Sequence, residues 1–362
     1  MQPIVSIIVP CYNVAPYVDA CLDSLVNQTL RDIEIICVND GSTDATPSLL
    51  CAWEGRDSRI RVIDQENGGL SVARNTGMAA AAGEYIGFVD PDDYVEHAMY
   101  ARLLEEARLH DADVTACGYT GFSDRDGSVL AEWTRSADGG VDKDAQASAF
   151  HEKALWKRME VVAWNKLYKK QFLQDCGVLF EPSFRKGEDD VFWLMLLVHA
   201  KCLAVIPDRL YWYRKQRDGA ISHAWEKSGC PLMLDAERLL HATAYWKKCR
   251  WLESGMKRGW VLHFLWYYML ERLIRTNRPF PRLSLEEWAL LHDRCREWFA
   301  LTGGVDRFEN LDKWELSFCH LLAGPAERPL PATRFLWRLL SRRRGRCGRY
   351  YTLRGFLASC KT

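Results

Sequence analysis

The stretch GEYIGFVDPDD, residues 83–93, decides how the first half of this chain folds. Its apolar run 85–89 is typical of a buried strand, and it leads directly into Asp90, Asp92 and Asp93. Three carboxylates this close together repel one another unless a cation lies among them. The sequence therefore predicts a strand that ends at a charged site, and the surrounding residues indicate what that site holds.

Strand and helix patterns alternate over the first 118 residues. Besides 85–89, short β-branched runs predict strands at 5–9, 33–38, 60–64 and 113–117. Apolar residues at helical spacing, or a capping residue such as Asp44, predict helices at 18–26, after Asp44, from 71 to 83, and at 97–110. This alternation favours an α/β fold, a mainly parallel, Rossmann-like sheet with helices on both faces and ligands at the carboxyl ends of its strands.

The rest of the chain has a different composition. Residues 118–150 are polar and glycine-rich, which indicates a loop or hairpin, and no strand pattern follows about residue 222. We expect an α/β domain at 1–225, a helical region at 226–330 and a basic amphipathic tail at 331–362. The tail has nine Lys and Arg and no Asp or Glu, so the body carries a net charge of about −9 within a neutral chain.

Leader and cysteine patterns indicate the compartment. The amino-terminal residues MQPIVSIIVP lack the features of a signal peptide, and the longest apolar run, 260–270, is too short to span a bilayer. The thirteen cysteines are odd in number and include no C-x-x-C pair. We therefore expect reduced, non-ligating cysteines and a cytoplasmic protein.

Polar segments follow each of the first three predicted strands: PCYN at 10–13, NDGSTD at 39–44 and QENGGLSVARN at 65–75. None is a G-x-G-x-x-G dinucleotide fingerprint. Each has a structural explanation of its own, as a turn, a helix cap or a solvated arginine. Convergence of all three on one sheet edge favours a binding site, and Arg74 near a helix start suits a phosphate.

The acidic cluster fits a divalent cation held against a diphosphate. Mg²⁺ and Mn²⁺ prefer oxygen ligands and bind through one or two carboxylates plus substrate phosphates. Such a cation stabilises the diphosphate as a leaving group. Helix capping by Asp92 or Asp93 would explain one of the three acids but not all of them.

These motifs together resemble a known family. SIIVPCYN, VNDGSTD, ENGGLSVARNTGMAAAAGEYIGFVDPDD, AWNKLY and GEDDVF occur in the order found in family 2 glycosyltransferases with the GT-A fold. The resemblance covers roughly residues 4–220. It implies inverting transfer of a sugar from a nucleotide-diphosphate donor, usually UDP-linked, with Mn²⁺ or Mg²⁺ as cofactor.

The resemblance also implies roles for individual residues. The nucleoside pocket would be lined by Pro10, Tyr12 and Asn13, and Asp40 would bind the uracil edge. Asn67 and Arg74 would lie beside the base, ribose and phosphates. Asp90 and Asp92 would form the D-x-D motif, with Asp92 favoured as the direct metal ligand.

The second half of the resemblance supplies the acceptor side. Inversion needs a base for the acceptor hydroxyl, and in RKGEDDVFW the family's base would be Asp189, oriented by Glu188. The neighbouring Asp190 leaves a one-residue shift of that role open. Further candidates for acceptor or phosphate contacts, or for simple packing, are Trp164, Lys166, Arg214, Arg217 and His223.

Partners and rival functions follow from the same residues. We expect a glycan or lipid-linked acceptor, no nucleic acid, and either a membrane-surface or a purely solvated role for the basic tail. One rival is a sugar-1-phosphate nucleotidyltransferase, which PCYNVAPY disfavours because it lacks a glycine-rich basic loop. The other is a catalytically inactive partner subunit, which the intact acids Asp92 and Asp189 disfavour.

Overall fold

The computed structural model describes residues 2–133, 139–145, 159–216, 231–250, 252–253 and 285–302. The chain divides into two compact units, one of Met1–Ala145 with Leu155–Ala224 and one of Gln146–Ala154 with Trp225–Thr362. The basic tail at 331–362, most of the region 226–330, and the candidate residues Arg217 and His223 lie outside the described residues.

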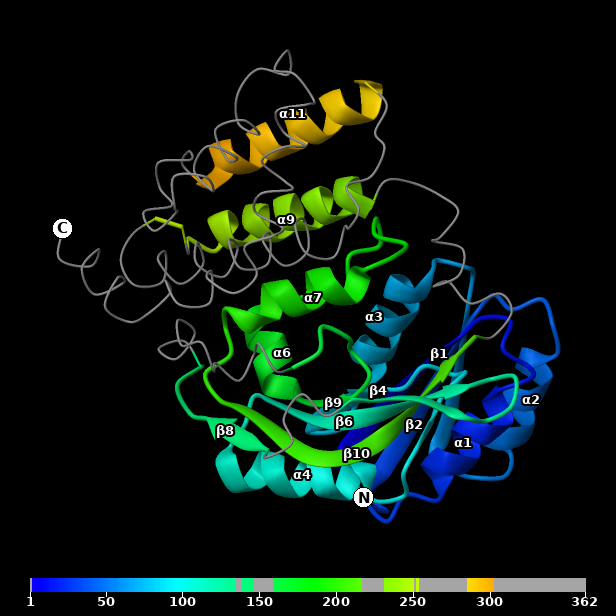
Figure 1. The fold of residues 1–362 in the computed structure, drawn as a ribbon. Coiled ribbons are helices and arrows are strands. Elements are labelled where there is room, and N and C mark those ends of the chain that lie inside the picture. Colours follow the sequence, from blue (N-terminus) through cyan, green and yellow to red (C-terminus); the bar gives the residue numbers. More distant parts are fainter. Residues whose placement is uncertain are drawn as a thin grey trace. The chain divides into compact units, whose positions relative to one another are not determined.

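Ten strands among the described residues form one sheet in the first unit (Figure 1). Its main path runs β3-β2-β1-β4-β9-β6-β10-β5, and β7 and β8 pair with β6 and β10. The strands are β1 (Val5–Cys11), β2 (Ile33–Asp40), β3 (Ile60–Gln65), β4 (Tyr85–Phe88), β5 (Tyr94–Val95), β6 (Val114–Ser123), β7 (Val129–Trp133), β8 (Gly140–Asp142), β9 (Lys166–Lys169) and β10 (Leu203–Lys215).

The sheet is mixed: the predicted parallel pairing is found among β1 to β4 and again between β6 and β10, and other pairs are antiparallel. Strands β1 to β4 are parallel, whereas β9 pairs antiparallel with both β4 and β6. The predicted strand 113–117 also runs further, to Ser123, and forms a hairpin with β7 inside the stretch expected to be a loop or hairpin. The order of motifs along the chain could not show that β9, which follows β6 in sequence, is inserted between β4 and β6.

Helices cover both faces of this sheet, as predicted. Figure 1 shows α3, α6 and α7 over one face and α4 beneath the other. The helix expected after Asp44 begins at Thr46, whose backbone N–H donates to Asp44 at 2.9 Å. The helices are α1 (Val18–Val26), α2 (Thr46–Glu54), α3 (Leu70–Ala80), α4 (Met99–His110), α6 (Lys170–Cys176), α7 (Glu188–Leu197), α9 (Pro231–Lys248) and α11 (Leu285–Thr302).

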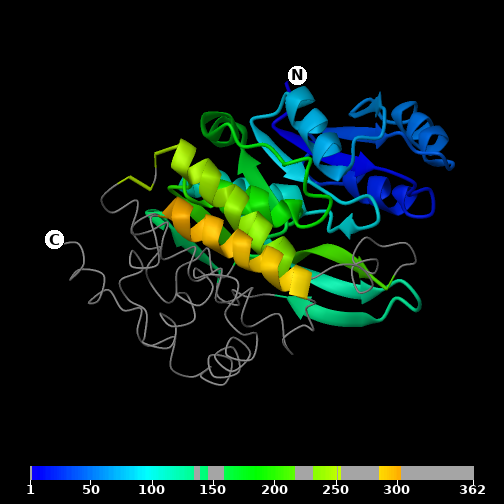
Figure 2. The ribbon, with the colours of Figure 1, turned by 90° about the horizontal axis from the view of Figure 1, so that it is seen from above.

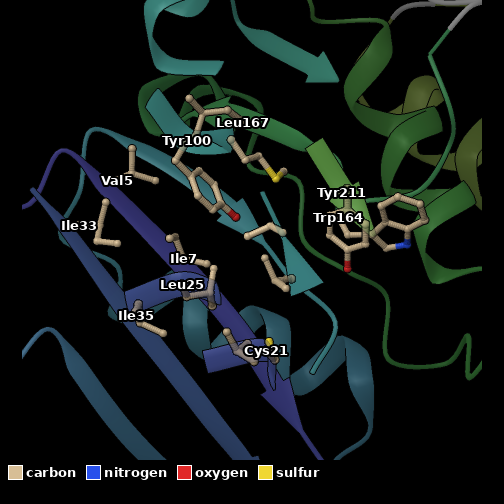
Figure 3. Close-up of a cluster of buried hydrophobic side chains, with 14 of the residues drawn as sticks. Val5, Ile7, Cys21, Leu25, Ile33, Ile35, Tyr100, Trp164, Leu167 and Tyr211 are labelled. Carbon is tan, nitrogen blue, oxygen red and sulfur yellow. The ribbon is translucent and has the colours of Figure 1, made fainter. Parts of the chain in front are cut away.

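The main core fills the space between β1, β2 and the helices α1 and α4 (Figure 3). Inward residues of the strands, such as Ile7 and Ile35, contact Leu25 of α1 in a cluster without solvent exposure. At Gly87, a Cβ atom would lie 2.5 Å from the Tyr100 ring. Glycine is therefore required in β4 for α4 to approach. This packing fixes the strand that leads into residues 90–93, which we call the acidic loop.

The second unit contains the described helices α9 and α11. They contact each other and lie side by side in both views (Figures 1 and 2). Trp246 of α9 is fully buried, and the indole N–H of Trp298 donates to the Thr243 hydroxyl at 2.9 Å. Among the described residues, no helix is both long and apolar enough to cross a bilayer.

Candidate active site

The carboxyl ends of the first four strands bring the predicted motifs to one edge of the sheet. In the strand register, Cys11 lies opposite Asn39, and Asn39 lies opposite Asp64. On the other side of β1, Phe88 lies opposite Ile8, so the acidic loop leaves β4 beside the end of β1. The polar segments that are separated in sequence therefore follow neighbouring strands in space.

The three residues predicted to line the nucleoside pocket, Pro10, Tyr12 and Asn13, differ in exposure, and Tyr12 presents its aromatic ring to solvent. Tyr12 is 49% exposed. Pro10 is buried inside β1, so it supports the loop from within the sheet. Asn13 has a left-handed backbone (φ 50°), and its side-chain oxygen accepts a hydrogen bond from the Thr43 backbone N–H at 2.8 Å. Asn13 thereby ties the first loop to the second.

Asp40 is only 3% exposed and holds the loop after β3. Its Oδ1 accepts from Gln65 Nε2 at 2.7 Å and from the Gly68 N–H at 2.8 Å, and its Oδ2 accepts from the Gly69 N–H at 2.8 Å. Asn67 is also engaged, since its Nδ2 donates to the Asp40 backbone carbonyl at 2.9 Å. Asp40 therefore has a structural task that the sequence did not reveal, and only Oδ2 has capacity left for a ligand donor.

The three acids after β4 have three different environments. Asp93 is 1% exposed and accepts from the Tyr211 hydroxyl at 2.8 Å and from a backbone N–H of β10 at 2.7 Å. Burial, reinforced by Asp92 and Asp90, raises the pKa of Asp93 well above its ordinary value. Asp90 is paired with Arg74, and Asp92 is partly exposed. The cluster therefore consists of one buried structural acid and two acids that reach the surface.

Arg74 is the cation among these carboxylates. Its side chain is 1% exposed, and its guanidinium lies 2.9 Å from Asp90 Oδ1, 3.0 Å from Glu188 Oε1 and 2.7 Å from Asp189 Oδ1. Burial lowers its pKa, but the three acids outweigh burial and raise it, so the guanidinium stays charged. The resemblance placed Arg74 beside the base, ribose and phosphates of a donor. Within the protein, Arg74 is surrounded by three carboxylates and by the Phe180 ring, whose centre lies 5.1 Å from the guanidinium carbon.

Glu188 and Asp189 begin α7, directly after Gly187 in a left-handed conformation (φ 72°). Burial and the neighbouring Asp189 raise the pKa of Glu188 to about 7. Burial also raises the pKa of Asp189, against the opposing effect of Arg74. The helix start and Arg74 favour negative charge at these acids and oppose the effect of burial, and the pKa of both remains raised.

Asp189 and Asp190 differ in access. The Asp189 side chain is 17% exposed, and its Oδ2 accepts a long hydrogen bond from the Ala163 N–H at 3.3 Å. Asp190 is 6% exposed. Asp189 is thus the acid of the pair that both meets Arg74 and retains exposed surface.

Trp164 and Lys166 pack inside the unit, so the acceptor-contact interpretation is not needed for either. Trp164 is 4% exposed and stacks on Tyr211 at 4.3 Å between ring centroids (Figure 3). Lys166 is fully buried, and its ammonium donates to the Val162 carbonyl at 2.6 Å and to Asn165 Oδ1 at 2.9 Å. Burial lowers the pKa of Lys166 to about 8.

Arg214, near the carboxyl end of strand β10, lies beside the acidic loop. Its Nε donates to the Asp92 backbone carbonyl at 2.6 Å, and its Nη1 pairs with Asp124 at 2.7 Å. Sequence reasoning missed that Tyr211 and Arg214 both bind Asp93, because each of them is separated from Asp93 by about 120 residues. The only sequence signal was the third acid of DPDD, which capping did not fully explain.

The donor set fits a hard divalent cation that also binds a ligand's phosphates. Asp90 and Asp92 supply carboxylates on one loop, and Asp90 keeps 23% of its side chain exposed beside Arg74. Within the described ranges, no group of three or more His, Cys, Asp or Glu side chains could hold a metal ion by itself. Two carboxylates plus phosphate oxygens are the coordination that Mg²⁺ commonly adopts.

Comparisons with known sequences agree with this geometry. The family model described as glycosyl transferase family 2 matches residues 6–169. Glycosyltransferase GlyG of Streptococcus pneumoniae serotype 4 is 34% identical over 226 residues, which cover 61% of this chain and 73% of GlyG. The uncharacterized glycosyltransferase EpsJ of Bacillus subtilis is 43% identical over 218 residues, which cover 59% of this chain and 62% of EpsJ. The chain thus matches less than two thirds of EpsJ's length.

Comparison with solved structures supports the same fold. The crystal structure of Staphylococcus aureus TarS 1–349 in complex with UDP-GlcNAc matches with a TM-score of 0.72 at 17% identity, over 94% of this chain and 91% of TarS 1–349. That protein and this chain therefore share an α/β glycosyltransferase fold, as the motif resemblance implied. Sequence relatives, family model and fold agree, and this chain belongs to glycosyl transferase family 2.

Proposed function

We propose that this protein transfers a sugar from a UDP-sugar to a hydroxyl group of a glycan or lipid-linked acceptor, with inversion and with Mn²⁺ or Mg²⁺ as cofactor. The observation that carries the proposal is the position of Arg74 between Asp90 and Asp189. One guanidinium joins the loop suited to a diphosphate-bound cation to the helix start suited to a base. The cation at the leaving diphosphate and the base for the acceptor hydroxyl would then lie on either side of the same sugar.

Asp189 is the proposed base. In an inverting transfer, the acceptor hydroxyl loses its proton on the side of the sugar opposite the leaving diphosphate. Arg74 holds Asp189 Oδ1 at 2.7 Å, which leaves Oδ2 to receive that proton. A raised pKa makes the carboxylate a stronger base than an exposed Asp, and burial of Asp190 supports Asp189 over its neighbour. Glu188 binds the same Arg74 guanidinium and would orient Asp189.

Asp90 and Asp92 are the residues that would hold the cation. When bound, the cation would supply positive charge to the two phosphates and stabilise them as a leaving group. Asp92 is favoured as the direct ligand, as the family resemblance implies, while Asp90 Oδ1 accepts from Arg74 at 2.9 Å.

The nucleoside side of the proposal rests on Tyr12 and Asp40. The ring of Tyr12 is 49% exposed next to the ends of β1 and β2, where a base can stack on it. Asp40 Oδ2 has one acceptor position left for the uracil N–H. Uridine is favoured over other bases because the structurally similar TarS was solved with UDP-GlcNAc. The transferred sugar would be a hexose or an N-acetylhexosamine.

The acceptor and the location of the reaction are proposed from composition. The tail 331–362 mixes nine basic residues with aromatic and aliphatic ones, as segments that lie on anionic membrane surfaces do. A cytoplasmic enzyme held at the inner face of a membrane by this tail would meet lipid-linked glycans, and we include this location in the proposal.

A donor screen tests the proposed function. The purified chain is heated with UDP, UDP-GlcNAc, UDP-glucose, GDP-mannose or ADP-glucose, each with Mn²⁺ or with EDTA, and the melting temperature is recorded. We expect a clear rise with the uridine compounds in Mn²⁺ and a much smaller rise in EDTA, since ligand binding to the folded state stabilises it. Equal protection by a purine nucleotide would contradict the uridine assignment, and equal protection in EDTA would contradict the metal.

A further inference from the structure

The end of β10 holds the acidic loop through four hydrogen bonds from two residues. The Tyr211 hydroxyl donates to Asp93 Oδ2 at 2.8 Å and accepts from the Asp90 backbone N–H at 3.1 Å. The Arg214 backbone N–H donates to Asp93 Oδ1 at 2.7 Å, and its Nε donates to the Asp92 carbonyl at 2.6 Å. Each residue of the loop that bears a carboxylate is therefore fixed from a strand more than a hundred residues away.

The Arg214 side chain is itself held on several sides. Its Nη1 pairs with Asp124 Oδ1 at 2.7 Å, and the other oxygen of Asp124 accepts from the Tyr17 hydroxyl at 3.2 Å. The guanidinium carbon lies 5.0 Å from the Tyr17 ring centre and 4.7 Å from that of Phe122. With the side chain 14% exposed, this arrangement leaves Arg214 little freedom to move.

Arg214 makes contacts that a lysine at this position could not make. A guanidinium donates in two fixed directions at once, here to the Asp92 carbonyl and to Asp124, and its flat face stacks on two rings. A lysine ammonium keeps the charge for Asp124 but cannot keep both directed hydrogen bonds from one rigid plane. The contact to Asp92 is made to its peptide carbonyl, so Arg214 orients the backbone from which the Asp92 carboxylate extends.

We infer that Arg214 is a positioning residue that fixes the Asp92 peptide, so that the Asp92 carboxylate faces the cation of the donor diphosphate. The inference rests on the proposed function, since it assigns Arg214 to the same metal site. It replaces the sequence prediction of a direct phosphate or acceptor contact, because Nε and Nη1 are already engaged within the protein. Partners that orient a metal ligand typically change metal affinity by about 10- to 100-fold when mutated.

The experiment compares Arg214→Lys with Arg209→Lys. Arg209 lies in the same strand, and its Nη1 pairs at 2.9 Å with Glu132 of β7 in a half-exposed surface contact. UDP binding is measured by calorimetry in EDTA and across a Mn²⁺ titration. We expect Arg214→Lys to raise the Mn²⁺ concentration for half-maximal enhancement by about 10-fold or more. The UDP affinity of Arg214→Lys in EDTA should match that of the wild type. For Arg209→Lys, both the UDP affinity in EDTA and the Mn²⁺ concentration for half-maximal enhancement should match the wild type.

Asp124→Asn gives a second variant in case Arg214→Lys folds poorly. It keeps the shape of the side chain but removes the charge that holds Nη1, so we expect a smaller shift of the Mn²⁺ titration in the same direction. An unchanged Mn²⁺ titration in both variants would overturn the inference. So would an equal loss of UDP affinity with and without metal in Arg214→Lys, which would indicate a direct phosphate contact.

The same experiment separates this inference from the proposed function. If wild-type protein binds UDP with no Mn²⁺ enhancement, the metal role fails, and the positioning role fails with it. If wild-type protein shows the enhancement and Arg214→Lys keeps it, only the positioning role fails.

Discussion

Arg74 and Asp189 form an ion pair of 2.7 Å across 115 residues of sequence. The same guanidinium binds Asp90 at 2.9 Å, so the proposed base and one of the proposed metal carboxylates share a single buried cation. In this arrangement the loop after β4 and the start of α7 cannot shift independently. The proposed donor site and the proposed base are therefore joined through one side chain.

Replacing Arg74 by Met should destabilise the protein most at neutral and higher pH. It leaves Asp90, Glu188 and Asp189 without their cation, and removing one partner of a buried pair costs about 3–5 kcal/mol. The stability deficit should shrink as pH falls, because Glu188 and Asp189, whose pKa values are raised, are then neutralised by protonation. Urea unfolding of both proteins at about pH 8 and about pH 5 measures it. An equal deficit at both pH values would argue against an electrostatic role.

Replacing Glu188 by Gln should move the pH dependence of transfer. The pKa of Glu188 is raised to about 7 by burial and by Asp189, so the wild-type kcat/KM should rise with pH through about that value. The two acids titrate as a coupled pair. Without a second acid beside it, Asp189 should ionise at lower pH, and the rising limb should shift down. A profile that stays in place would remove Glu188 from the catalytic pair.

Replacing Lys166 by Met should change how stability depends on pH. The pKa of Lys166 is lowered from 10.5 to about 8 by burial, so the folded state releases its proton before the unfolded state does. Charged Lys166 therefore costs stability below about pH 8, and this cost disappears as pH rises toward 10.5. Between about pH 7.5 and 9.5, wild-type unfolding free energy should gain about 2 kcal/mol relative to the variant. A parallel pH dependence of the two proteins would indicate that Lys166 is solvated.

Replacing Tyr12 by Ala should weaken UDP binding without affecting folding. The ring is 49% exposed, so its loss removes little packing, whereas base stacking on an aromatic ring contributes about 1–3 kcal/mol. Calorimetry should show a loss of roughly 5- to 150-fold in UDP affinity, with the melting temperature of the free protein unchanged. Leu179→Ala, another exposed apolar side chain, is the control. Equal UDP affinity in the two variants would indicate that the uracil ring binds away from Tyr12.

The half of the site that follows from strand order could be predicted from sequence. Parallel strands end at the same edge, so the segments after β1 to β4 had to meet once these strands were recognised. The acids of DPDD also required a cation, and Arg74 is one. The sequence pattern could not predict which side chain each charged residue would bind. Arg74 was expected at a phosphate, and in the structure it is 1% exposed among carboxylates.

The remaining contacts depend on topology that local patterns do not encode. Tyr211 and Arg214 reach the acidic loop because β10 pairs with β5, which directly follows that loop. Strand β9 enters the sheet between β4 and β6 and carries the Ala163 region to Asp189. Neither pairing has a sequence signature, since each joins segments separated by more than forty residues.

The most direct test of the account is the rate of UDP release from UDP-GlcNAc, or from whichever donor the screen selects, by Asp189→Asn and its matched neighbour Asp190→Asn. Removing a general base should lower kcat by about 10²- to 10⁴-fold. We predict this loss for Asp189→Asn, with donor affinity within about twofold of the wild type, and a much smaller loss for Asp190→Asn. A fully active Asp189→Asn variant, or an inactive Asp190→Asn variant beside it, would contradict the assignment of Asp189 as the base.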